Sequence, residues 1–478
     1  MRELLGDLID SAARRAEYAD ARFVRTRAEK LSTRNGALDQ LDSDETEGIG
    51  VRVRVGGAWG FAAVHGSDRG EAEAALDRAL AVAAAQPAAT GSPLAPEPPA
   101  VGAWETPVER DPFAVPLEQK LAVLGAIDAT MRTVPGVNLT LAQFQARRVE
   151  KLFASTEGAL CEQRTTECGG GIAAVAADGS ESQTRSYPAS HGGLVAQAGY
   201  EHFLALDLPG AAPRVSEEAV ALLRAPACPP GRNTLVLAGE QLGLQVHESV
   251  GHAVELDRVL GRELSYAGTS FVQADAIGRL RIGSEQVNVT ADAGSLGGLG
   301  SYRWDDEGVE ARPLPIVRDG VLAGFLSSRE TAAEIGLERS GGCMRADGFA
   351  RQPIVRMTNV NLEPGDAGTL EDLLADTEEG LLIETNRSWS IDNRRLHFQF
   401  EGEAAWEIKG GERGRLLRNP SYAGLTPEFW ASCNAICSPS EWRLVSLLDC
   451  GKGEPGQVMR VSHGSAPARF RDVQVGVA

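Results

Sequence analysis

The chain places two histidines and a glutamate within one short run, His247-Glu248-Ser249-Val250-Gly251-His252. Imidazole nitrogens are common zinc ligands, and a glutamate beside an open coordination position can act as the general base of a metallopeptidase. The whole chain has only 7 histidines, so the run is a candidate for half of a zinc site with its catalytic base. The alternative is a coincidence of composition, with both histidines satisfied in a core or exposed.

The spacing of the two histidines is unusual. In the common metallopeptidase motif they are four residues apart, which puts both rings on one face of a regular helix. His247 and His252 are five apart, and side chains at that spacing point roughly 140° away from each other. An inserted residue of π type would restore the shared face, and such distortions are frequent at functional sites. We therefore expect a distorted helix, with Gly251 as the residue that tolerates the distortion.

Length and composition limit the class of protein. A chain of 478 residues exceeds a single core and suggests two to four domains. The net charge of -19 and the pI near 5.0 argue against a surface for nucleic acid or for an anionic membrane. Residues 1–18 predict an amphipathic helix rather than a signal peptide, and no apolar segment approaches the length of a membrane span. Seven scattered cysteines do not make a disulfide framework, so we expect a reducing cytoplasm.

The pattern of apolar residues and turn signals predicts an α+β fold. Residues 1–86 predict an N-terminal domain with a helix, a hairpin sheet with a turn signal at Asn35-Gly36, and a closing helix at about Arg69 to Ala85. The proline-rich and alanine-rich residues 87–112 predict a linker. Residues 113–228 predict a middle α+β unit of a helix and hairpins. Residues 229–478 predict a β-rich C-terminal domain, in which an early strand leads directly into the helix that carries the histidines.

A catalytic zinc site needs a third protein ligand and leaves the fourth position to water. Cys433 and Cys437 are close enough in sequence to suggest a second site, but without nearby histidines they are more typical of a core. Spacing alone does not choose among the candidates for the third ligand. These are the many acidic residues, His397, His463, Cys343, Cys433, Cys437 and Cys450.

Several stretches together resemble a known family. They are the run His247 to His252, Tyr302 to Gly308 with its Asp-Asp-Glu-Gly end, Thr385 to Ser390, and the tail from Cys450-Gly451-Lys452-Gly453 through Pro467 to Phe470. The joint pattern is similar to the TldD/PmbA family of zinc metallopeptidases and runs through most of the chain after residue 228. The order of elements in the first unit is also similar to the family's N-terminal domain.

The resemblance implies that Cys450 is the third ligand of one zinc ion per catalytic chain. A thiolate with two imidazoles suits zinc better than magnesium or calcium; the alternative is a buried structural thiol. Glu255 and Asp257 are candidates to orient the imidazoles by accepting their other N–H groups, unless they form a solvated helix end. His463 and His397 are further candidates around the ligands.

The resemblance also implies an activity and partners. A water activated by zinc, with Glu248 as general base, would hydrolyse small or unfolded peptides, including leader segments of modified peptides. The family resemblance implies a homodimer, or a heterodimer with a zinc-lacking paralogue. The rival interpretation is a non-catalytic regulatory or peptide-binding subunit, in line with older descriptions of the family as modulators of DNA gyrase. Glu248 distinguishes the peptidase from the binding subunit, because a binding subunit has no reason to keep a base beside the metal ligands. Zinc-dependent hydrolysis of a non-peptide amide is a third possibility.

Overall fold

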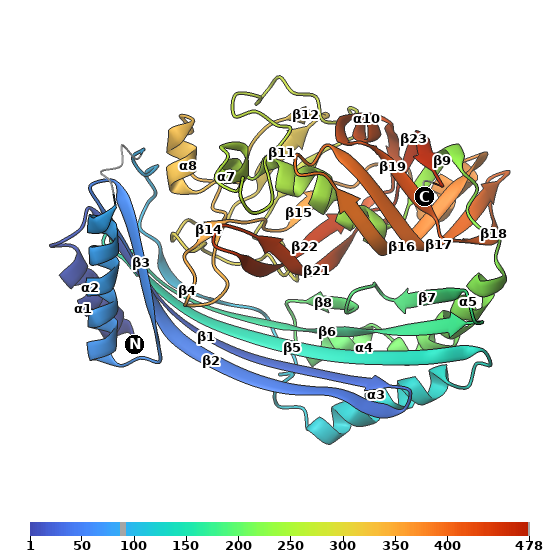
Figure 1. Cartoon of the computed structure of the whole chain (residues 1–478), viewed down its shortest axis with the longest axis horizontal. Coiled ribbons are helices and arrows are strands. Elements are labelled where there is room, and N and C mark those ends of the chain that lie inside the picture. The colour runs from blue at the N-terminus through green and yellow to red at the C-terminus, as the bar shows by residue number, and fades with distance from the viewer. Residues whose placement is uncertain (87–91, 477–478) are drawn as a thin grey trace.

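A computed structural model describes residues 1–86 and 92–476 of the chain. A long curved sheet from the N-terminal half lies on one side, and a β-rich C-terminal half lies on the concave face of that sheet (Figure 1). The predicted α+β class is confirmed, and so is the β-rich C-terminal domain. None of the helices within residues 1–86 and 92–476 has the length and apolar character of a membrane-spanning segment.

The curved sheet is built from eight strands in the order β3-β2-β1-β5-β6-β4, with β7 and β8 also paired to β6. Asn35 and Gly36 both have positive φ, 49° and 82°, as the tight turn between two antiparallel strands requires. The sequence signal for this hairpin is therefore confirmed. The strands are β1 (Tyr18–Arg34), β2 (Ala37–Val55), β3 (Ala58–His65), β4 (Val101–Glu105), β5 (Val137–Ser155), β6 (Leu160–Ala177), β7 (Ser182–Tyr187) and β8 (Leu194–Ala196).

The first unit (1–86) and the middle unit (113–228) share this one sheet, which the sequence did not indicate. Strand β1 pairs with β5 along almost its whole length, from Asp20 opposite Ser155 to Arg34 opposite Leu141. The predicted linker (87–112) is partly strand, because β4 within it pairs in parallel with β6. Its first residues, 87–91, lie outside the described part of the chain. Pairing between strands so distant in sequence leaves no local pattern that could reveal it.

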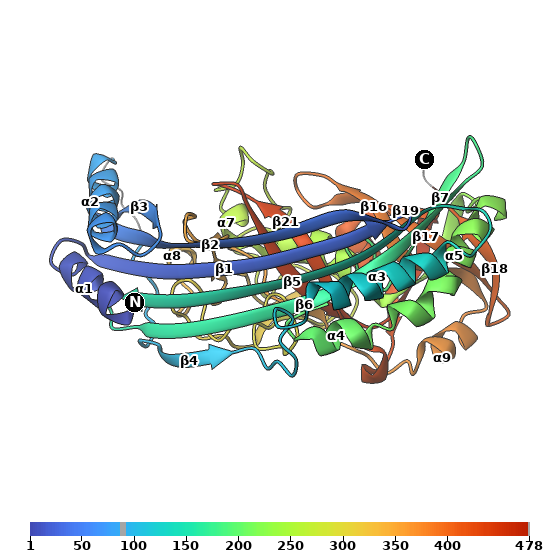
Figure 2. The ribbon, with the colours of Figure 1, turned by 90° about the horizontal axis from the view of Figure 1, so that it is seen from below.

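Helices cover the ends and the convex face of the sheet. Helices α1 and α2 lie at one end, whereas α3, α4 and α5 pack toward the other end, on the face turned away from the C-terminal half (Figure 2). The predicted helix at 69–85 is confirmed at these bounds, and Asp68 caps it by accepting a hydrogen bond from the Glu71 N–H. The helices are α1 (Arg2–Ala12), α2 (Arg69–Ala85), α3 (Leu117–Met131), α4 (Tyr200–Ala205) and α5 (Leu208–Arg224).

The C-terminal half is built around a ring of five strands, because β16-β9-β23-β19-β17 closes on itself through the pairing of β16 with β17; β18 and β20 extend it. These strands are β9 (Gly231–Leu237), β16 (Glu379–Ile391), β17 (His397–Lys409), β18 (Glu412–Arg418), β19 (Ser421–Leu425), β20 (Cys433–Ile436) and β23 (Ala468–Val475).

Smaller elements surround the ring, and one hairpin, β21 (Arg443–Lys452) with β22 (Gln457–Ser465), points toward the curved sheet (Figure 1). The other strands are β10 (Val289–Ala291), β11 (Leu314–Arg318), β12 (Val321–Leu322), β13 (Met344–Arg345), β14 (Ile354–Val355) and β15 (Val360–Leu362). The helices are α6 (Gly239–Val246), α7 (Leu256–Val259), α8 (Arg329–Glu334), α9 (Leu370–Ala375) and α10 (Thr426–Ala431).

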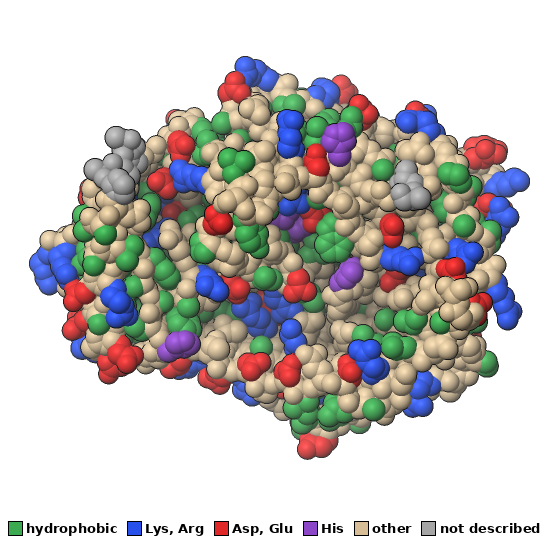
Figure 3. All heavy atoms as spheres, viewed as in Figure 1, with side chains coloured by type: hydrophobic (Ala, Val, Ile, Leu, Met, Phe, Trp, Pro, Cys, Tyr) green, Lys and Arg blue, Asp and Glu red, His purple; other side chains and the backbone are tan. Residues whose placement is uncertain are grey.

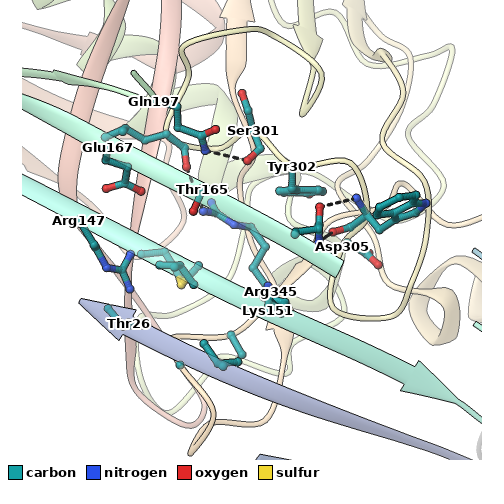
Figure 4. Close-up of a pocket in the computed structure, with 18 of the residues that line it drawn as sticks. Thr26, Arg147, Lys151, Thr165, Glu167, Gln197, Ser301, Tyr302, Asp305 and Arg345 are labelled. Atoms are coloured by element: carbon teal, nitrogen blue, oxygen red, sulfur yellow. Dashed lines mark hydrogen bonds between the residues drawn. The ribbon is translucent and has the colours of Figure 1, made fainter. Parts of the chain in front are cut away.

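Buried charges join the two halves. Asp306 forms ion pairs of 2.5 Å with Lys151 and 3.3 Å with Arg22, both on the curved sheet. Next to this joint lies a cavity of about 80 Å³ between the sheet and the C-terminal half, where Gln197 donates a 2.8 Å hydrogen bond to the Ser301 carbonyl (Figure 4). The Asp-Asp-Glu-Gly stretch therefore fixes how the C-terminal half sits on the sheet.

Candidate metal centre

The histidines lie on a distorted helix, as their spacing predicted. Strand β9 leads into α6, and the helix continues as a π-helical turn over His247–Gly251 and a 3-10 turn over His252–Val254. The His252 N–H bonds to the His247 carbonyl, five residues back, where a regular α-helix would bond four residues back. The extra residue turns both imidazoles toward the same side, with their ring centroids 4.7 Å apart.

The role of Gly251 differs from the one expected. Its backbone angles, φ -54° and ψ -58°, are ordinary helical values that any residue adopts. A Cβ at this position would lie 2.2 Å from the Sδ atom of the buried Met357. Glycine is needed here because another segment packs against the helix, not because the backbone is strained.

His247, His252 and Cys450 are brought together by two separate elements. Cys450 comes from β21, and one potential ligand atom of each of the three residues lies within 4.8 Å of the others. The Cys450 Sγ and His252 Nε2 atoms are 3.5 Å apart, close to the roughly 3.6 Å that tetrahedral angles and usual zinc–sulfur and zinc–nitrogen lengths require. Within 1–86 and 92–476 this is the one group of its kind. The donor set and its spacing fit zinc.

Hydrogen bonds set the tautomers of both rings. The His463 Nδ1 atom lies 2.7 Å from the Val360 carbonyl, which can only accept, so Nδ1 carries the proton and Nε2 is free to accept. The His247 Nδ1–H therefore donates to His463 Nε2, also over 2.7 Å. The His252 Nδ1–H donates to Glu255 over 2.8 Å. Each of the two histidines is left with an unprotonated Nε2, the form that binds a metal.

The protonation states of the three candidate ligands agree with this arrangement. Burial lowers the pKa of His247 to about 4 and that of His252 well below its ordinary value. Burial opposes ionisation of Cys450, but the charge of the buried Arg356 guanidinium acts in the opposite direction, and the pKa of the thiol is lowered. Arg356 is fully buried and also donates to the Cys450 carbonyl.

Cys450 differs from the other six cysteines in the direction in which its pKa is shifted. Burial raises the pKa of each of the others to about 11 or 12. Cys433 and Cys437 are both buried, and no third ligand among the described residues joins them in a metal-binding group. Only the Cys450 environment favours a thiolate, the form that binds metal.

Glu248 lies beside the ligands and is held by two residues of one hairpin. The Trp389 Nε1–H donates to Oε1 over 2.9 Å, and Arg395 forms an ion pair with Oε2. Trp389 belongs to β16, and Arg395 lies in the turn to β17, where its φ of 62° is in the left-handed region. The sequence motif placed Trp389 in a family stretch without a role and gave no signal for Arg395 or Arg356.

Of the four residues predicted to lie around the ligands, two contact the imidazole rings and two do not. Glu255 and His463 hold the two rings, as described. Asp257 does not take part: its carboxylate accepts a 2.6 Å hydrogen bond from the buried Lys452, which also lies 3.3 Å from Glu255. The idea that Glu255 and Asp257 form a solvated helix end is wrong, because both are buried. His397 is exposed at the start of β17 and lines a different pocket.

The candidate ligands and Glu248 line a cavity of about 240 Å³. The space-filling view shows the molecule hollowed between the curved sheet and the C-terminal half, with histidine and basic side chains in the hollow (Figure 3). The cavity is lined by Ala189, Ser190, His191, Glu240, Leu244, His247, Glu248, His252, Asn386, Trp389, Arg395 and residues 445–451.

Two histidines and a cysteine that could hold one metal ion, with a glutamate beside them in a cavity, are typical of a metallopeptidase. Family models agree: the PmbA/TldA metallopeptidase domain 1 matches residues 19–85, the central domain 110–225 and the C-terminal domain 230–477. The chain belongs to the TldD/PmbA family of metallopeptidases.

Relatives and solved structures agree with the family. A metalloprotease of Methanothermobacter thermautotrophicus is 31% identical over 480 residues, which cover 99% of this chain and 98% of the relative. A zinc metalloprotease TldD homolog of Saccharolobus solfataricus is 29% identical over 248 residues, 52% of each chain. The crystal structure of TldE from Thermococcus kodakarensis has the same fold, with a TM-score of 0.76 at 15% identity, over 99% of this chain and 100% of that one.

Proposed function

We propose that this chain is a zinc-dependent peptidase that hydrolyses peptide bonds in small or unfolded peptides, including leader segments of modified peptides. The observation that carries the proposal is the convergence of His247, His252 and Cys450 with Glu248 on one cavity. The cavity, of about 240 Å³, suits an extended segment of chain better than the surface of a folded protein.

His247 Nε2, His252 Nε2 and Cys450 Sγ would hold the zinc ion. When bound, zinc supplies a Lewis acid that polarises a peptide carbonyl and makes a water nucleophilic near neutral pH. His463 and Glu255 accept hydrogen bonds from the Nδ1–H groups of the two rings, and this keeps both rings in the tautomer that binds a metal through Nε2.

Glu248 would move the proton. Its carboxylate takes a proton from the attacking water and returns it to the leaving amine nitrogen. The Trp389 indole and the Arg395 guanidinium each bind one of its oxygens, so the carboxylate faces the cavity in one orientation. A carboxylate has about four lone-pair sites, so each oxygen keeps one with which to accept a hydrogen bond from the attacking water.

The alternative is a non-catalytic regulatory or peptide-binding subunit. A binding subunit needs a cavity but no base, whereas Glu248 is held beside the ligands by two dedicated partners. This arrangement supports catalysis over binding alone. Relatives named metalloproteases support the same choice.

The test measures zinc content and cleavage of an unfolded peptide for the wild type and three variants. Glu248→Ala should keep zinc and lose cleavage, and Cys450→Ser should lose zinc. Cys433→Ser is the matched control, since Cys433 is equally buried but outside the site, and it should keep both. Full zinc and activity in Cys450→Ser would show that the ligand assignment is wrong. A wild type that binds no zinc would exclude the peptidase.

The proposed assembly is a homodimer or a heterodimer with a zinc-lacking paralogue. Residues 37–47 of β2 pair with β1 on one side, but β3 covers only Gly48–Val55 on the other. An open strand edge can pair with another chain. This edge carries five acidic residues, Asp39, Asp42, Asp44, Glu45 and Glu47, and their ion-pair partners among the described residues are two arginines of β1, Arg25 and Arg34. The remaining negative charge would repel a second copy and favour a less acidic partner. Native mass spectrometry of the chain with and without its paralogue tests the choice.

A further inference from the structure

The cavity at the metal centre continues along helix α6 to a second carboxylate. Glu240, Leu244 and His247 are spaced four and three residues apart, so they lie on one face of the helix, and all three line the cavity. Seven residues of helix place Glu240 about 10 Å from His247 along the axis. A long side chain can bridge this separation from a peptide held at the metal centre, and a short one cannot.

The walls between the two ends are largely apolar. Leu244 of the helix, Val445 and Leu447 of β21, and Ala189 all line the cavity. Such walls suit a methylene stem, and the carboxylate beyond them suits a polar head. Two other acidic residues line the cavity. Glu248 is used in the catalytic step, and Asp449 is exposed to solvent.

Glu240 has no cation of its own. Its Oε1 accepts hydrogen bonds from the Ser190 N–H over 3.2 Å and from the Ser190 hydroxyl over 3.3 Å. No ion pair with Glu240 occurs among the residues that the structure describes. Burial, followed by the charge of the neighbouring Glu403, raises the pKa of Glu240 to about 7.

The arginine whose charge acts on Glu240, Arg185, is already paired with other carboxylates. Arg185 forms ion pairs of 2.7 Å with Glu218, 2.6 Å with Glu384 and 3.7 Å with Glu403. Its single charge is therefore shared among three carboxylates before Glu240 is counted. Glu218 and Glu384 have second partners in Arg214 at 3.0 Å and Arg413 at 3.4 Å, whereas Glu240 has no ion-pair partner among the described residues. A cation entering from the cavity would supply one.

We propose that the cavity binds a lysine or arginine side chain next to the scissile bond, with its stem between Leu244 and Val445 and its cation on Glu240. This inference rests on the proposed peptidase function and adds a substrate class to it: peptides with a basic residue at the cleavage site. Glu240 is then a specificity-determining residue.

The experiment uses zinc-loaded full-length protein and internally quenched peptides that differ at one position. The position carries lysine, norleucine or glutamate in an otherwise neutral sequence; norleucine keeps the stem and removes the charge. The wild type should show a kcat/KM about tenfold or more higher for lysine than for norleucine, and mass spectrometry should locate the cut beside the lysine.

The variants compare ratios within one protein, so that losses of stability or zinc cancel. In Glu240→Gln the ratio of lysine to norleucine should approach one, and in Glu240→Lys the glutamate peptide should be preferred. Asp449→Asn is the matched control, because it removes another carboxylate that lines the same cavity but is exposed. Its ratio should remain that of the wild type.

The outcomes separate this inference from the function on which it rests. A wild type that cleaves all three peptides at equal rates leaves the peptidase intact and overturns the role of Glu240. A zinc-loaded wild type that cleaves none overturns the peptidase. In that event, binding of the same peptides to zinc-loaded Glu248→Ala decides the inference: tighter binding of the lysine peptide supports the basic subsite, and equal binding refutes it.

Discussion

Replacing Gly251 by alanine tests why glycine stands between the two histidines. The new Cβ would lie 2.2 Å from Met357 Sδ, whereas ordinary contacts begin at 3.4 Å. Either Met357, which is fully buried, or the π-helical turn must move by about 1.2 Å, the difference between these two distances. Overpacking of this kind costs about 1–3 kcal/mol, and alanine recovers about 0.5–1 kcal/mol as the better helix former.

The net penalty is therefore about 1–2 kcal/mol. If the turn moves, the two imidazoles move with it. The zinc affinity should then fall roughly 5- to 30-fold. Competition with a chromophoric chelator measures that affinity, and thermal unfolding of the metal-free protein measures the part that falls on stability.

The decisive comparison is made in a second background. Met357→Ala removes the obstacle, although the cavity it leaves costs about 2–5 kcal/mol by itself. In that background Gly251→Ala should become neutral or slightly stabilising, because only the helix preference of alanine remains. Gly125→Ala in α3 is the matched control, since a Cβ there meets nothing within 4 Å. If Gly251→Ala has the same effect with and without Met357, packing is not the reason for the glycine.

Three further changes probe the site. His463→Ala removes the acceptor of the His247 Nδ1–H and should lower zinc affinity about 10- to 100-fold in a chelator competition; unchanged affinity would refute the tautomer argument. Trp389→Phe removes a hydrogen bond to Glu248 and should lower kcat about tenfold at full zinc content; unchanged turnover would count against an orienting role. Glu240→Gln removes a carboxyl whose pKa rises from 4.5 to about 7 on folding. The folded protein then holds the proton more tightly than the unfolded chain, so the wild type loses stability as pH rises from 4.5 to 7. The variant should gain about 3 kcal/mol over the wild type at pH 8 and nothing below pH 4.5, as thermal unfolding at both pH values would show; a gain independent of pH would contradict it.

Local features of the fold could be predicted from the sequence because their causes are local. The bounds of α2 follow from the Asp68 cap and the following alanine-rich segment, and the Asn35-Gly36 turn follows from the positive φ that these residues accept. The shared sheet could not be predicted, because the pairing of β1 with β5 joins residues more than a hundred positions apart. Two separate units were the natural interpretation of a chain whose strands pair across a linker.

The candidate site shows the same division. His247, Glu248 and His252 share one helical segment, so their types and spacing were sufficient to predict both the metal and the distortion. Cys450 reaches them on a hairpin, and only the family resemblance selected it among seven cysteines. Arg395 is one of 47 basic residues and acts only because the β16–β17 turn lies over Glu248.

Resemblance to a family does not by itself separate chemistry from positioning. The Asp-Asp-Glu-Gly stretch was as much a part of the family pattern as the histidine run, yet Asp306 and Glu307 contact basic residues of the curved sheet, among them Lys151 and Arg52. These pairs are buried, and removing one partner of a buried pair leaves an uncompensated charge. The stretch therefore supports the site from a distance: it holds the C-terminal half on the sheet, and the cavity lies between residues of both, from Ser190 to Glu248.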